Sequence, residues 1–96
     1  MTGFQNTMLD LIPVPAVDVE TELVDGEVLL YHPQQTRAVY LNPTAAVVWG
    51  LCDGSRPVRE IIRVIVESYP DADASLTDDV LGTLNQLQEN GVLVVG

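Results

Sequence analysis

Between residues 17 and 41 the chain alternates in the way that β-strands do, and after residue 42 its apolar residues recur with helical spacing. From 17 to 23, apolar or β-branched residues alternate with acidic ones, which predicts a half-buried strand. Asp25-Gly26 supplies the positive φ angles that a two-residue hairpin turn requires. Residues 28–31 are then the return strand, and a second turn at 33–35 leads to a third strand at 37–41. The pattern predicts a three-stranded antiparallel meander.

Helical spacing begins where the third strand ends. Asn42 is suited to cap a helix that starts at Pro43 and stops near Gly54, and because this helix is apolar almost all round it should be buried. A second helix, ended by Pro70, follows from the stripe Val58, Ile61, Ile62, Ile65, Val66 and Tyr69. A third helix is predicted by the stripe Leu76, Val80, Leu84, Leu87 and Gly91. It starts at residues 75–78, whose sequence is similar to a capping box. The predicted fold class is α+β, with the sheet followed by three helices.

The two ends of the chain lack a sustained period. Residues 1–15 contain Pro13 and Pro15, which prevent a continuing helix, and we interpret them as a flexible N-terminal arm ahead of one domain at 16–96. The sequence leaves open whether this arm docks on the domain or on another subunit, as in a homodimer. The apolar residues 92–95 either add a strand or pack on the core.

Charge narrows the class of partner. The chain has 14 acidic residues against 4 basic ones, and its net charge of −10 argues against nucleic acid or an anionic membrane as partner. A neutral or basic peptide is compatible with it. A single cysteine fits a reducing compartment, and the sequence has neither a signal peptide nor an apolar run long enough to span a bilayer. We therefore expect a cytoplasmic protein.

Residues capable of catalysis are few. His32 has no second metal ligand at useful spacing, and Cys52 lies among apolar residues, where a thiol is usually a small core residue. No glycine-rich phosphate loop is present. Asp78 and Asp79 are adjacent on a helix and so point about 100° apart, which does not suit a catalytic carboxylate pair. We expect no enzymatic activity, no metal and no cofactor.

Two other classes of protein share parts of this pattern. A winged-helix DNA-binding protein would use residues 76–90 as its recognition helix, but that helix carries three acidic residues and no basic one, so it would repel phosphates. An acyl carrier protein has Asp-Ser-Leu at a helix start. Here Ala74 interrupts that motif, and strands precede it.

Several short segments, in order and spacing, do point to a family. They are Leu41-Asn42-Pro43-Thr44-Ala45-Ala46, Leu51-Cys52-Asp53-Gly54, Val58 with Glu60-Ile61-Ile62, Tyr69-Pro70, Asp79-Val80 with Leu84 and Leu87, and Gly91-Val92-Leu93. Over roughly residues 17–94 the chain resembles the PqqD family, the recognition elements of ribosomally made and later modified precursor peptides (RiPPs). Pro57 departs from the family, which often has a capping threonine there.

The resemblance implies a small winged helix-turn-helix-like domain without enzymatic activity. Such proteins bind the leader segment of a precursor peptide and present it to a modifying enzyme, often a radical SAM protein. The leader adds as a strand to the third β-strand and lies in a groove beside the third helix. By position, main-chain pairing then falls to Arg37, Ala38, Val39, Tyr40 and Leu41, and the helix wall to Thr77, Leu81, Asn85 and Gln88.

The residues themselves support an exposed strand edge independently of the family. Little in the chain looks able to cover the outer side of the third strand, and an unpaired edge offers N–H and C=O groups to an extended peptide. Leu81 is either an anchor for such a peptide or an ordinary core residue, and Tyr40 has the same two interpretations. Arg37 either pairs with a leader carboxylate or protects the edge from aggregation. An interaction module that uses this edge, or the arm, to bind a folded protein or itself is the alternative function.

Overall fold

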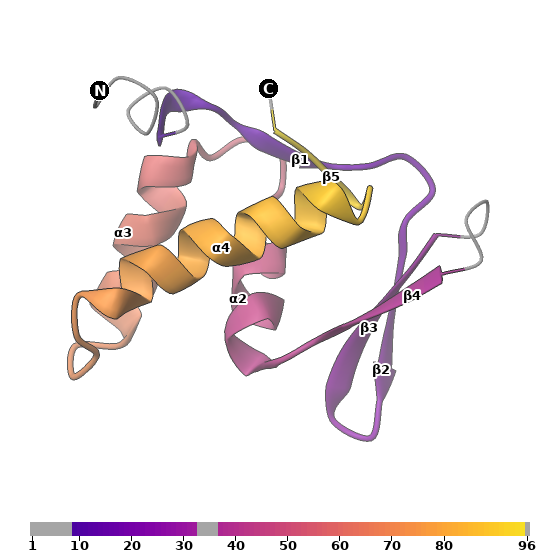
Figure 1. Ribbon diagram of the computed structural model, residues 1–96, viewed down its shortest axis with the longest axis horizontal. Coiled ribbons are helices and arrows are strands. Elements are labelled where there is room, and N and C mark those ends of the chain that lie inside the picture. Colours follow the sequence, from indigo (N-terminus) through magenta and orange to yellow (C-terminus); the bar gives the residue numbers. More distant parts are fainter. Residues whose placement is uncertain (1–8, 33–36, 96) are drawn as a thin grey trace.

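The structure, a computed structural model, describes residues 9–32 and 37–95. Within these residues the chain forms a three-stranded antiparallel sheet, three helices and a two-stranded sheet (Figure 1). In chain order the elements are β1 (Pro13–Pro15), β2 (Glu20–Val24), β3 (Glu27–His32), β4 (Arg37–Leu41), α2 (Pro43–Leu51), α3 (Val58–Ser68), α4 (Ser75–Glu89) and β5 (Leu93–Val95). The predicted α+β class, with the meander followed by helices, is confirmed. The turn predicted at 33–35 lies outside the described residues.

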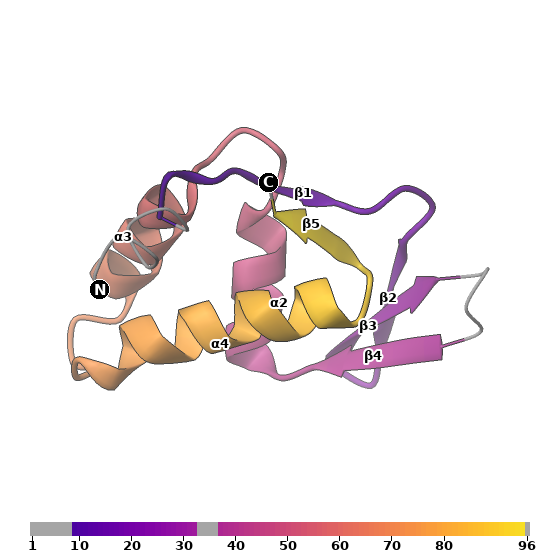
Figure 2. The same cartoon turned by 45° about the horizontal axis from the view of Figure 1, so that its top comes forward.

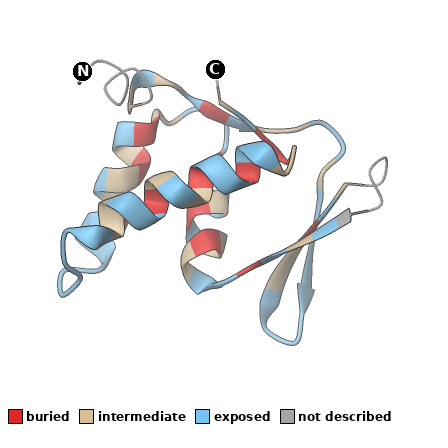
Figure 3. Cartoon of the chain, in the orientation of Figure 1, coloured by how far each residue is buried: buried red, intermediate tan, exposed pale blue. Residues whose placement is uncertain are grey.

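The hairpin of β2 and β3 forms at the predicted turn but differs at its outer strand. Asp25 and Gly26 have φ angles of 51° and 82°, as a two-residue turn of this kind requires. The prediction that the first strand begins at Val17 and is half-buried is wrong. β2 begins at Glu20, after Asp18 leaves the extended conformation with φ 70°, and all five of its residues are exposed. The physical reason is visible in Figures 1 and 3, where the hairpin extends past the helices that would have to cover it.

The core lies between the three helices and extends to one face of the sheet, where α2 contacts β3 and β4. Leu30 of β3 is fully buried, and the predicted stripes supply the other buried residues, Val58, Ile61 and Ile65 of α3 and Val80, Leu84 and Leu87 of α4. The stripe predicted for α3 is wrong at its end, where Val66 and Tyr69 are 42% and 43% exposed. The central residues of the core are Leu30, Val48, Ile61, Ile65, Val80 and Leu84. α2 is less enclosed than its composition predicts. Only Ala45 and Val48 are buried, and Val47 is 38% exposed, because α2 contacts its neighbours on one side.

The caps of α2 and α4 agree with the sequence in part. The Asn42 side chain accepts a hydrogen bond from the Ala45 N–H at 2.8 Å, as predicted. Gly54 is left-handed (φ 83°), but α2 has already ended at Leu51, so Gly54 does not cap it. The predicted capping box at 75–78 is wrong, because the Ser75 N–H and hydroxyl both donate to the Asp73 carboxylate.

The C-terminal end of α4 is closed as predicted. Gly91 has φ 77°, its N–H donates to the Gln88 carbonyl at 3.0 Å, and the Val92 N–H donates to the Leu87 carbonyl at 3.2 Å. These two bonds form a Schellman motif, which satisfies carbonyls that the helix itself leaves unpaired. The turn directs the chain into β5.

Residues 10–16 lie against the body of the domain. β1 pairs with β5 in antiparallel register, and Figure 2 shows the two strands side by side. The Val58 N–H donates to the Leu11 carbonyl at 2.9 Å, and Asp10 forms an ion pair with Arg59. Pro57 makes no side-chain cap, so the N-terminal segment supplies an acceptor for the first turn of α3 in its place. This part of the predicted arm docks on its own domain.

Cys52 is a buried thiol at the end of α2. It is 2% exposed, and its Sγ donates to the Val48 carbonyl at 3.2 Å. Burial raises the pKa of Cys52 from 9.0 to about 12, with a smaller contribution from the Asp53 carboxylate. The placement agrees with a core residue, because the thiolate that a nucleophile needs is disfavoured here.

We expect Cys52 to react slowly with a disulfide reagent in the native protein at pH 8 and rapidly in 8 M urea. The pKa of Cys52 is higher in the folded protein than in the unfolded chain. The stability that the neutral thiol contributes is therefore complete below pH 9 and is lost as the pH rises from 9 towards 12. Absorbance of the released thiol gives both rates. Native labelling at nearly the rate in urea would contradict the buried placement.

Candidate functional site

The edge of the main sheet is the first feature of the candidate site. Among the described residues β4 pairs with β3 alone, so its other side carries main-chain groups without a strand partner. Figure 1 shows β4 at the border of the sheet, leading directly into α2. An extended segment can add to such a border as a further strand.

The register determines which residues of β4 direct their main-chain groups outward. Val24 and Glu27 close the two-residue turn and form a hydrogen-bonded pair, and such pairs alternate along an antiparallel ladder. Leu29 and Tyr31 therefore bond towards β2, and the residues between them bond towards β4. In β4 the N–H and C=O groups directed at β3 are those of Arg37, Val39 and Leu41. Those of Ala38 and Tyr40 point to the open side.

The side chains of β4 divide between the two faces of the sheet. Leu41 is buried in the core and Val39 is half-buried beside it. Ala38 and Tyr40 lie on the opposite face, where Tyr40 is 66% exposed. Tyr40 is therefore not a core residue.

A hollow of about 400 Å³ lies at the end of β4 and is the second feature of the candidate site. Asn42, which directly follows β4, is one of its lining residues, and α4 supplies the opposite wall. Figure 2 shows α4 passing across the start of α2 at this point. The lining residues are Asn42, Thr44, Asp78, Asp79, Gly82, Thr83 and Gln86.

The helix residues expected from the sequence lie on another row of α4. Leu81 is half-buried against the core, Thr77 is half-buried, and Asn85 and Gln88 are exposed. None of these four lines the hollow. At 100° per residue, their row lies about 140° around the helix from the row that does. Which row faces β4 depends on how α4 crosses α2, and periodicity within one helix carries no information on that crossing.

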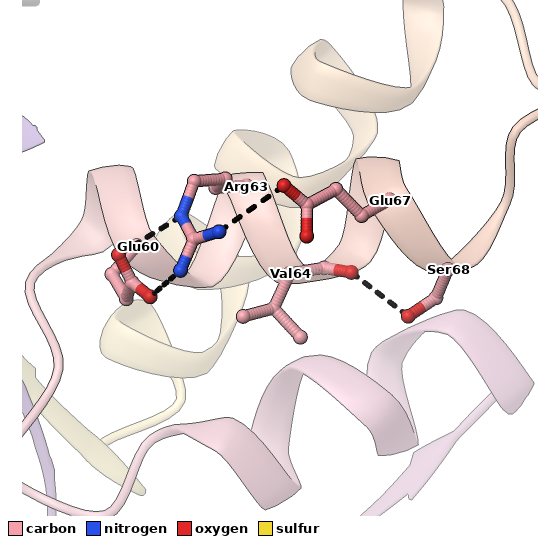
Figure 4. A network of polar contacts seen from close by, with 5 residues as sticks. All are labelled: Glu60, Arg63, Val64, Glu67 and Ser68. Atoms are coloured by element: carbon pink, nitrogen blue, oxygen red, sulfur yellow. Dashed lines mark hydrogen bonds and ion pairs between the residues drawn. The ribbon is translucent and has the colours of Figure 1, made fainter.

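The charged groups around the hollow are of one sign. The described arginine side chains, at positions 56, 59 and 63, pair with acidic residues elsewhere. Figure 4 shows one such network, in which Arg63 bonds Glu60 and Glu67 on the exposed side of α3 and lowers the pKa of Glu60. None of these arginines pairs with Asp78 or Asp79. The lining keeps two carboxylates without a cationic partner from the described residues.

The other candidates from the sequence remain apart from this site. His32 ends β3, and in the part of the chain that the structure describes no three His, Cys, Asp or Glu side chains gather as metal ligands would. No helix of that part is long and apolar enough to cross a membrane. The two features of the site, a strand edge and a polar hollow, suit the binding of a peptide.

Comparisons with known proteins identify a family and two solved structures of similar fold. The model of the family described as Coenzyme PQQ synthesis protein D (PqqD) matches residues 27–93. The solved structure of TbiB1 in complex with the TbiA(beta) leader peptide is similar, with a TM-score of 0.71 and 24% identity over 82% of this chain and 92% of that one. Lasso peptide synthetase B1 complexed with the leader peptide gives a TM-score of 0.74 and 16% identity over 86% and 98%. No curated protein matches the sequence.

Proposed function

Since the chain belongs to the PqqD family, we propose that it binds the leader segment of a ribosomally made precursor peptide, which adds to β4 as a further strand. The observation that carries the proposal is the open side of β4, with the outward main-chain groups of Ala38 and Tyr40. Both similar solved structures are complexes with leader peptides, which supports it. The chain acts without catalysis and presents the leader to a modifying enzyme, a radical SAM maturase or a similar protein, in the cytoplasm where precursors are synthesised.

Main-chain pairing alone does not give useful affinity. Ala38 and Tyr40 offer two N–H donors and two C=O acceptors, and at about 0.5–1.5 kcal/mol each four hydrogen bonds contribute roughly 2–6 kcal/mol. Ordering a flexible leader costs about 2–5 kcal/mol, which nearly cancels that gain. The affinity must therefore come from leader side chains that contact this protein. We propose that these contacts are made by β4 itself and by one row of α4. That row is either Thr77, Leu81, Asn85 and Gln88, with Leu81 as the apolar anchor, or the row that lines the hollow at the end of β4.

The test of this function is an NMR titration with the synthetic leader of the precursor encoded beside this gene. We expect amide shifts in residues 36–42 and 76–90, and little change in β2, the other edge of the sheet. A scrambled leader of equal composition is the control. The proposed function is wrong if the native leader gives no shifts at high micromolar concentration, or if its shifts centre on β2.

A further inference from the structure

We propose that the hollow at the end of β4 holds a basic side chain, lysine or arginine, of the bound leader. This inference rests on the proposed function and adds the chemistry by which this chain selects its leader. It concerns the lining residues Asn42, Thr44, Asp78, Asp79, Gly82, Thr83 and Gln86, none of which the sequence pattern assigned to peptide binding.

Position connects the hollow to the bound peptide. Asn42 lines the hollow and directly follows Leu41, the last residue of β4. A strand advances about 3.3 Å per residue, so a peptide paired with Tyr40 comes level with the hollow one or two residues further along. At about 400 Å³ the hollow is of the size that takes small ligands, and a long side chain fits it.

The chemistry of the lining matches a cation. Asp78 and Asp79 contribute carboxylates, and Thr44, Thr83 and Gln86 contribute further oxygen acceptors. A guanidinium has five N–H donors and an ammonium three, and neither has an acceptor. An acidic leader side chain would be repelled, and an apolar one would take water from the carboxylates without replacing its hydrogen bonds. Arg56, Arg59 and Arg63 pair with acidic residues elsewhere, which leaves Asp78 and Asp79 available to a cation of the leader.

Gly82 contributes open space to the hollow. It lies in the middle of α4, where glycine lowers the folding equilibrium roughly five-fold relative to alanine. Its backbone is helical and a Cβ at this position would meet no atom within 4 Å, so neither conformation nor packing requires a glycine. A methyl group here would project into the hollow. The space that Gly82 leaves is what a leader side chain would fill.

The first experiment measures coupling between the carboxylates and the leader. A fluorescein-labelled synthetic leader of the precursor encoded beside this gene is titrated with the full chain, and each leader lysine or arginine is replaced in turn by norleucine. We expect one replacement to weaken binding to the wild-type protein about 10-fold, and to weaken binding to the Asp78→Asn/Asp79→Asn variant less than two-fold. Glu22→Gln/Asp71→Asn removes the same charge away from the hollow and should keep the 10-fold effect.

The outcomes separate this inference from the proposed function. If the leader binds but no basic position couples to Asp78 and Asp79, or if it binds without having a basic residue, the inference is wrong and the proposed function stands. If the leader does not bind at all, both fail.

The second experiment uses two glycines of similar setting. Gly82→Ala should raise the urea midpoint and weaken leader binding by a few-fold, because the methyl group takes part of the space that the leader side chain uses. Gly50→Ala, in α2, also has no atom within 4 Å of the new Cβ but does not line the hollow. It should raise the midpoint and leave binding unchanged. Wild-type affinity in the Gly82→Ala variant would show that nothing enters the hollow.

Discussion

Replacing Ala38 with proline should weaken leader binding by roughly 10- to 100-fold while the domain stays folded. The Ala38 N–H points to the open side of β4, so its loss leaves the β3–β4 ladder intact. The proline ring instead removes a donor that the leader needs, and a buried acceptor left unpaired costs about 1–3 kcal/mol. Fluorescence anisotropy with the labelled leader measures the affinity, and circular dichroism with urea unfolding measures the fold.

The control for Ala38→Pro lies on the other edge of the same sheet. The Thr21 N–H of β2 also points outward, by the same alternation of hydrogen-bonded pairs. Thr21→Pro should therefore match Ala38→Pro in stability and bind the leader with wild-type affinity. Equal losses of affinity in the two variants would mean that the leader does not distinguish β4 from β2, and strand addition at β4 would have to be abandoned.

Leu84→Ala should lower the free energy of unfolding by about 2–5 kcal/mol. Leu84 is fully buried in the middle of α4, where it belongs to the core shared by the helices and the sheet. Domains of this size have a free energy of unfolding of only about 5–15 kcal/mol, so the variant should lose a large part of its stability. The midpoint and slope of urea unfolding, followed by tryptophan fluorescence of Trp49, measure the change.

Leu81→Ala is the matched control, with the same substitution in the same helix. Because Leu81 is only half-buried, we expect a smaller loss of stability than at Leu84. If Leu81 is the proposed anchor, its variant should also bind the leader more weakly while it remains folded. A loss of stability as large as at Leu84, with affinity unchanged in the folded fraction, would assign Leu81 to the core alone.

Local patterns predicted most of the elements. Asp25-Gly26 identified the hairpin because its φ angles are a property of the turn itself. The stripes of α3 and α4 identified their buried faces because helical spacing brings those residues together. The start of β2 was wrong for a different reason. Alternation from Val17 onward indicates which residues share a face, but whether another element covers that face depends on how far the helices reach.

Of the two features of the candidate site, only the edge strand could be predicted from the sequence. The edge position of β4 follows from the order of the meander, yet the outward direction of Ala38 and Tyr40 needs the register of all three strands. The hollow depends on the crossing of α4 over α2, which no spacing within α4 encodes. Gly82 did not reveal it either, because Gly50 interrupts a helix in the same way and lies away from the hollow.

The pairing of β1 with β5 has a practical consequence for protein engineering. Pro13 and Val95 are register partners, so a unit cut at these residues would begin and end at neighbouring points, at the cost of the contacts that residues 10–12 make with α3. Units with adjacent entry and exit points can be spliced into a loop of a host protein without being pulled open. This domain is therefore suited to insertion into a loop of a peptide-modifying enzyme.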